Sequence, residues 1–76
     1  KQREREMAID DAAKLAILLS HWIEHNEEHA GEFMEWAMKA KAGGKTPVHD
    51  HIMQAVKEIG AANRSLLAAL EGLKEG

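Results

Sequence analysis

Residues 41–47 read KAGGKTP, and this stretch divides the chain into two helical segments. Gly43 and Gly44 can adopt the left-handed conformation in which many helices end. Thr46 followed by Pro47 is typical of a helix start, with Thr46 as the N-cap and Pro47 at the first helical position. The stretch therefore predicts a turn over about 42–46, between a helix that ends near residue 41 and another that begins near residue 47.

The segments on either side of this turn have the composition and the periodicity of long helices. The chain is rich in Ala, Leu, Glu, Lys and Met, which favours helices over strands. A three-four alternation, typical of a helix-packing seam, recurs in both segments. In the first segment it selects Ala12, Leu15, Leu19, Trp22, Asn26, His29, Phe33, Trp36 and Ala40, and Ile9, Ala16, Ile23, Ala30 and Ala37 widen this seam on one side. In the second it selects His49, Ile52, Val56, Ile59, Asn63, Leu66, Leu70 and Leu73.

These patterns predict an all-α fold in which residues 1–76 form a single antiparallel hairpin, with helices over about 6–41 and 47–74. Two helices cannot enclose a core, and a chain of 76 residues without cysteine has no disulfide to compensate. We therefore expect a homodimer that forms a four-helix bundle, or a larger homo-oligomer. The alternative is that the hairpin is one half of a longer bundle protein.

Composition narrows the range of partners. The net charge of −3 argues against nucleic acid as a ligand. No apolar run reaches the ~20 residues of a membrane span, and the opening KQRERE has no apolar signal core behind it. The absence of cysteine is consistent with a reducing compartment, so we expect a cytoplasmic protein.

Residues 21–29 read HWIEHNEEH and place three histidines four residues apart. On a helix His21, His25 and His29 share a face, and Glu28 and Glu32 are helical neighbours of that face. Two imidazoles four apart can bind one cation, and a nearby carboxylate can add a ligand or hold the second ring nitrogen. We expect a divalent transition metal (zinc, iron or nickel) at His25 and His29, with Glu28 and Glu32 as carboxylate partners and His21 as an optional ligand. The alternative is a solvated histidine face.

Polar residues also interrupt the predicted seam. Matching the two seams about the turn places Asn26 opposite Asn63, and His29 opposite Ile59 or Gly60. A buried Asn fixes helix register at a cost in stability, so these residues are interpreted as a polar layer that sets register, or as support for a metal site. The cluster of His49, Asp50 and His51 lies about 15 Å along the hairpin from the first histidines. Its Asp50 favours a helix N-terminus, and the role of the cluster is left open.

The run HWIEHNEEHAGEFMEWA resembles a short helical domain of uncharacterised bacterial and archaeal proteins, over residues 15 to about 40. A looser similarity links the chain to ferritin-like helical hairpins, which assemble and bind iron through Glu and His. Their Glu-x-x-His pair is not met here, because Asn26 stands three residues before His29 and Trp22 three before His25.

Together these observations favour a small oligomeric helical module that holds or delivers a metal, with no catalytic residue. One alternative is an assembly or interaction domain without metal, in which the layer of His29, Asn26 and Asn63 sets the bundle register. A weaker alternative is a ferritin-like di-metal protein.

Overall fold

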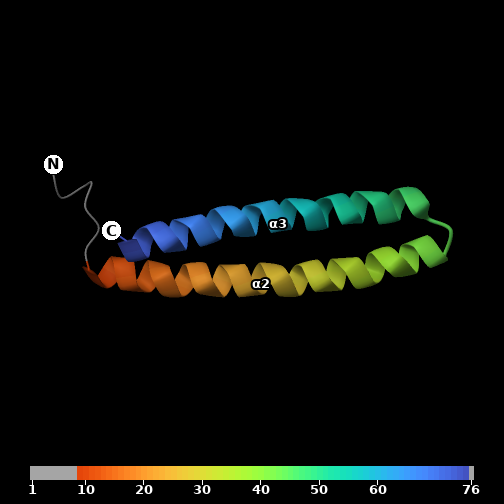
Figure 1. Ribbon diagram of the computed structural model, residues 1–76. Helices are drawn as coiled ribbons and strands as arrows, with labels where there is room; N and C mark the ends of the chain where they lie inside the picture. The colour runs from red at the N-terminus through yellow and green to blue at the C-terminus, as the bar shows by residue number, and fades with distance from the viewer. Residues whose placement is uncertain (1–8, 76) are drawn as a thin grey trace.

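The computed structural model describes residues 9–75, which form two long helices joined by a tight turn (Figure 1). Helix α2 spans Ile9–Ala42 and helix α3 spans Thr46–Glu75. The helices run antiparallel, so the ends of the described chain lie together at the pole opposite the turn. No strand occurs in this range, which confirms the prediction of an all-α chain with two helices. Residues 6–8, where the first helix was expected to begin, lie outside the described range.

The turn is built from three backbone hydrogen bonds and one left-handed glycine. Gly44 has a φ of 81°, a conformation that residues with a Cβ rarely adopt. The Lys45 N–H donates to the Ala40 carbonyl (2.8 Å), and the Gly44 N–H donates to the Lys41 carbonyl (3.0 Å). This pair of bonds is the Schellman motif, which satisfies the last carbonyls of α2. The prediction that glycine ends the first helix is confirmed at Gly44.

The start of α3 lies one residue before the predicted position. The His49 N–H donates to the Lys45 carbonyl (3.0 Å), which makes Lys45 rather than Thr46 the N-cap residue. Thr46 is consequently the first helical residue and Pro47 the second. The prediction placed the cap at Thr46 because Thr is a better cap than Lys. It is wrong by one residue because Lys45 serves both helices, closing α2 with its N–H and opening α3 with its carbonyl.

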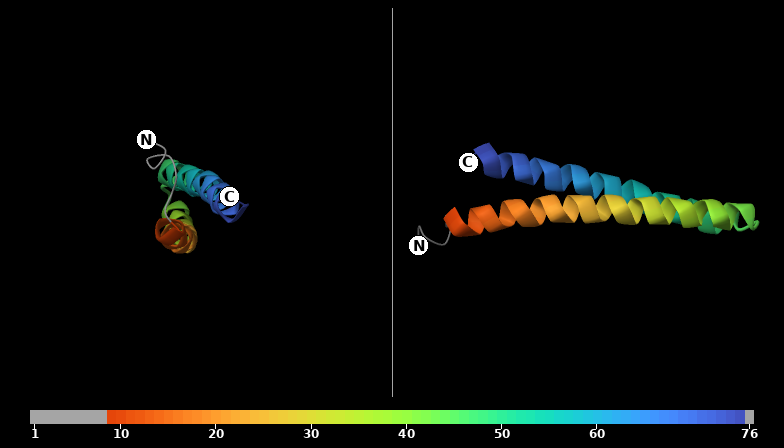
Figure 2. Two further views of the ribbon diagram at one scale, coloured as in Figure 1. Left: turned by 90° about the vertical axis from the view of Figure 1, so that its left-hand side faces the viewer. Right: turned by 90° about the horizontal axis from the view of Figure 1, so that it is seen from below.

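Little of the hairpin is buried. The molecule measures 57 × 18 × 18 Å, and its two helices cross at a shallow angle (Figure 2). Among the described side chains only Leu19, Ala37 and Leu70 are buried, at 4, 0 and 8% exposure. The seam predicted for α3 is confirmed, since its eight members are all buried or half-buried: His49, Ile52, Val56, Ile59, Asn63, Leu66, Leu70 and Leu73.

The seam predicted for α2 is partly wrong. Trp22 and Trp36 are 42 and 61% exposed, and His29, expected on the seam, is exposed as well. The residues that face α3 come from two sets, the flank of small side chains and part of the predicted seam. They are Ala16, Leu19, Ile23, Asn26, Ala30, Ala37 and Ala40. Small side chains let two helices approach closely, whereas a tryptophan at the same position would hold them apart. Helix α3 therefore packs on the alanine side of α2 and leaves the aromatic side uncovered.

The outward surfaces of both helices mix charged residues with exposed apolar side chains. Charged residues recur along their exposed positions, including Glu24, Glu28 and Glu35 on α2 and Lys57 and Glu71 on α3. Within residues 9–75, no helix combines the length and the apolar character needed to cross a membrane.

Candidate metal centre

Two imidazoles meet on the exposed side of α2. His25 and His29 are one helical turn apart, so their side chains project from the same face. Their Nε2 atoms lie 3.1 Å from each other. The ring centroids are 4.5 Å apart and the rings are nearly perpendicular, at 89°. The predicted pairing of His25 with His29 is thus present in the structure, with both rings accessible to solvent.

The second nitrogen of His29 is held by a carboxylate. His29 Nδ1 lies 3.3 Å from Glu32 Oε1, and both side chains are exposed, at 47 and 68%. An ionised carboxylate only accepts hydrogen bonds, so a neutral His29 must donate from Nδ1. Its Nε2 then carries the lone pair, which accepts the Nε2–H of His25. Glu32 therefore selects the tautomer of His29 in which Nε2 is available to a cation.

The separation of the two nitrogens suits a shared ion. With metal–nitrogen bonds of about 2.05 Å, a 3.1 Å separation gives an N–metal–N angle of roughly 98°. That value lies between the angles of octahedral and tetrahedral coordination. In this hydrogen-bonded state one Nε2 carries the proton, so His25 would bind an ion through Nε2 only as its Nδ1–H tautomer. The helix thus presents the two donors without any change of backbone.

The other predicted ligands do not join this pair. His21 stacks beside His25, with centroids 6.2 Å apart and ring planes 16° apart, whereas the ring nitrogen of His25 meets that of His29. Glu28 makes no hydrogen bond to either imidazole among the described residues, although it follows His25 at the same spacing as Glu32 follows His29. Within residues 9–75, no group of three or more His, Asp or Glu side chains is arranged to hold one ion. A single chain therefore offers two nitrogen ligands and one supporting carboxylate.

A polar layer lies on the other side of α2, facing α3. Asn26 Nδ2 donates to Asn63 Oδ1 (2.9 Å), and Asn63 Nδ2 donates to the Ile23 carbonyl (3.1 Å). Both side chains are half-buried. The predicted pairing of Asn26 with Asn63 is confirmed, but His29 is not part of the layer. The bond to Ile23 has no signature in the sequence, because its acceptor is a backbone atom.

The second histidine cluster is separate from the first. His49 Nδ1 lies 2.9 Å from Asp50 Oδ1, and the His49 side chain is 17% exposed. The Asn26–Asn63 pair sets the register and places His49 about eleven residues, or roughly 16 Å, along the hairpin from His29. His51 is exposed. The expectation that one chain cannot join the two clusters therefore agrees with the register.

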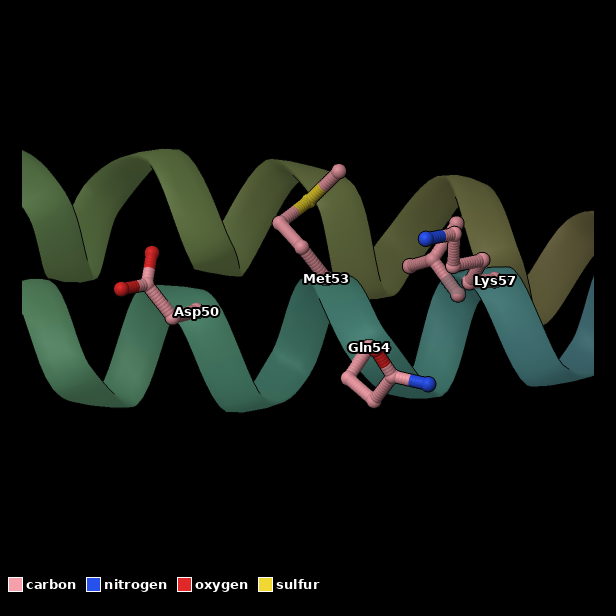
Figure 3. Close-up of a pocket in the computed structure, with 5 residues that line it drawn as sticks. Asp50, Met53, Gln54 and Lys57 are labelled. Atoms are coloured by element: carbon pink, nitrogen blue, oxygen red, sulfur yellow. The ribbon is translucent and has the colours of Figure 1, made fainter.

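Among the surface hollows of the described residues, two differ clearly in their linings. The first lies on α3 and is lined by Asp50, Met53, Gln54, Val56 and Lys57 (Figure 3). Its labelled side chains spread apart and bring no set of polar atoms together. The second lies between the helices and is wholly apolar, lined by Phe33, Trp36, Ile52 and Ala55. Lys39 Nζ covers the Trp36 ring at 4.2 Å, a contact between residues three apart that the sequence reading missed.

Comparison with known proteins places the chain in a family. Residues 15–73 match the family described as Domain of unknown function (DUF8180), so the matched region includes the histidine pair, the asparagine layer and the turn. The chain belongs to this family. The match bears out the resemblance to an uncharacterised short domain, and the matched region extends from α2 through most of α3. No curated protein and no solved structure matches the chain.

Proposed function

We propose that this DUF8180 chain is a small, oligomeric helical module that binds a divalent transition metal through His25 and His29. The observation that carries the proposal is the approach of the two Nε2 atoms to 3.1 Å, with Glu32 on the far nitrogen of His29. A metal-bound imidazole commonly donates its other N–H to a carboxylate, which orients the ring and raises its basicity. A helix face that served only to contact water would need neither the close approach nor that carboxylate.

The donor atoms restrict the class of ion. Imidazole nitrogen suits zinc, nickel and iron, whereas calcium and magnesium prefer sets of oxygen ligands. With only two nitrogens from one chain, the remaining coordination positions fall to water or to another chain. Both imidazoles are exposed, so an ion can enter and leave without a conformational change. These features favour holding or delivering an ion over catalysis with it.

Titration of metal into tag-free, chelator-treated protein tests this function. Calorimetry with Zn²⁺, Ni²⁺ and anaerobic Fe²⁺ should give saturable binding for at least one ion. The same ion at 100 times its Kd should stabilise the fold by about 2.7 kcal/mol. His25→Ala and His29→Ala should each abolish tight binding. His51→Ala, which removes an exposed histidine from α3, is the matched control and should bind like the unchanged chain.

Position 21 provides a sharper version of the test. A face that binds metal only through its histidine content would lose affinity equally in His21→Ala and His25→Ala. The stacked ring of His21 predicts that only His25→Ala loses tight binding. Equal affinities in all these variants, or no binding by the unchanged chain, would refute the metal function.

A second function is favoured by the asparagine layer. Two hydrogen bonds between α2 and α3 at a half-buried position suit a domain whose role is defined assembly. In that case the oligomer forms, and stays equally stable, with or without metal. Light scattering of the chelator-treated protein, alone and with added Zn²⁺, separates the two functions.

A further inference from the structure

The uncovered side of α2 carries a second heptad-like stripe. This outer stripe consists of Leu15, Leu18, Trp22, His25, His29, Phe33 and Trp36. Four of its large apolar members are open to solvent, with Leu18 43%, Trp22 42%, Phe33 36% and Trp36 61% exposed, while Leu15 is half-buried. His29 is seven residues from each tryptophan, so it occupies the same position on the helix as both. The imidazole pair is therefore the polar centre of an otherwise apolar stripe.

Helix α3 completes this face with small residues. The apolar hollow joins Phe33 and Trp36 of α2 to Ile52 and Ala55 of α3, which places Ala55 on the same side as the outer stripe. Ala62 and Ala69 follow at intervals of seven, and both are exposed. A row of alanines leaves room for another helix to approach the backbone closely. The face is thus a long, largely apolar surface whose centre carries the imidazole pair and Glu32.

The dimensions of this face match what a dimer requires. One whole side of the hairpin has an outline of 57 × 18 Å, or roughly 1,000 Å², which leaves room for the accessible surface of about 800 Å² that each partner buries in a standard protein interface. The hairpin alone buries only three side chains among those described, which is too few for a chain of this size. Covering the outer stripe would supply a core that the isolated hairpin lacks.

We propose that a second copy of the chain covers this face, with the α2 helices antiparallel, and that the two His25–His29 pairs bind one metal ion on the two-fold axis. In an antiparallel pair of helices the two heptad positions of the seam alternate across the interface. An axis midway between His25 and His29 sets His25 of each chain against His29 of the other. The same axis places Leu18 of each chain opposite Trp36 of the other. It places Trp22 at the height of Glu32 and Phe33 of the other chain. Large apolar residues thus meet one another at both ends of the stripe.

This arrangement completes the ligand set that one chain leaves unfinished. Four Nε2 atoms provide the four nitrogens of a closed tetrahedral site, the geometry that zinc adopts in structural sites. The two Glu32 carboxylates, one on each His29, balance the charge of a divalent ion bound by neutral imidazoles. The inference rests on the proposed metal binding and adds the partner, the orientation and the stoichiometry.

Stoichiometry and oligomeric state test the inference together. Zn²⁺ calorimetry of the full chain should give one ion for every two chains, and light scattering should give a dimer. Trp36→Glu places a charge on the face and should yield a monomer with weakened zinc binding. Met38→Glu is the matched control, because Met38 is 59% exposed on the same helix but is not part of the outer stripe. It should leave the dimer and the stoichiometry unchanged, and far-UV circular dichroism should show that both variants remain helical.

Cross-linking tests the orientation without depending on that variant. The chain has no cysteine, so introduced thiols are the sole targets of a short bis-maleimide reagent. The double variant Leu18→Cys/Trp36→Cys should cross-link into dimers, whereas Leu18→Cys alone should not. Efficient cross-linking of Leu18→Cys alone would indicate parallel helices and overturn the proposal.

The outcomes separate this inference from the function on which it rests. If no ion binds, the metal function fails and the four-histidine site fails with it. If zinc binds one-to-one to a monomer, and Trp36→Glu binds equally well, the metal function stands and the shared site is wrong. A dimer with one ion per two chains that is lost in His25→Ala supports both.

Discussion

The two asparagines between α2 and α3 make unequal contributions to stability, and the hydrogen bonds predict the order. Asn63 uses its Oδ1 and its Nδ2 in two bonds, whereas Asn26 takes part in one of them. A net contribution of about 1 kcal/mol per hydrogen bond gives a loss of about 2 kcal/mol for Asn63→Ala and about 1 kcal/mol for Asn26→Ala. Alanine recovers about 0.6 kcal/mol of helix propensity at either position. The expected net losses are therefore about 1.4 and 0.4 kcal/mol.

The measurement is a double-mutant cycle. Urea unfolding of the unchanged chain, both single variants and the double variant is followed by circular dichroism at one fixed chain concentration, because any oligomer makes stability concentration-dependent. The shared bond predicts a coupling energy of about 1 kcal/mol between the two positions. Since helix propensity favours both variants equally, it cancels from their difference. Asn26→Ala costing as much as Asn63→Ala, or a coupling energy near zero, would refute the hydrogen-bond reasoning.

Three further perturbations follow from the geometry. Gly44→Ala should lower the free energy of unfolding by about 1 kcal/mol, because Gly44 has a positive φ. Gly31→Ala should raise the free energy of unfolding by about 0.5–1 kcal/mol, since a Cβ at position 31 meets no atom within 4 Å. Thermal melts in which both variants shift the melting temperature in the same direction would contradict this. Ala37→Leu should cost about 1–3 kcal/mol, because Ala37 is fully buried between the helices, and an unchanged urea midpoint would argue against that close packing. Glu32→Gln should weaken zinc binding by about 10-fold in calorimetry, with Glu28→Gln as the control, and identical affinities would remove Glu32 from the site.

The fold could be predicted because the local sequence signals are compatible with few other structures. The two glycines and the proline of KAGGKTP mark the turn, and the seam of α3 follows from its spacing because leucine and isoleucine occupy most of it. The pairing of Asn26 with Asn63 could also be predicted, since matching two seams about a short turn leaves little freedom of register. The one-residue error at Lys45 arises because a backbone carbonyl can cap a helix with no help from its side chain.

The side of α2 on which α3 packs could not be predicted with the same success. Two overlapping seams share Leu19 and Asn26, one continuing through alanines and the other through Trp22, His29 and Trp36. The large apolar side chains of the aromatic seam led to the prediction that this seam faces α3. In the structure the alanine seam faces α3, because small side chains let two helices approach closely. Spacing alone correctly brought His25 and His29 together. It did not show that Glu28 bonds to neither imidazole while Glu32 reaches Nδ1 of His29, because that depends on side-chain conformations.

Because Lys45 takes part in both helix ends, the turn contains no residue that belongs only to a loop. One residue's N–H and carbonyl close one helix and open the next, so the hairpin depends on a single left-handed peptide at Gly44. If that residue became right-handed, α2 would continue toward α3, but Pro47 has no N–H to donate inside a continuous helix and would kink it there. The turn is thus fixed from both sides, by a glycine that the reversal of the chain requires and by a proline that opposes a continuous helix.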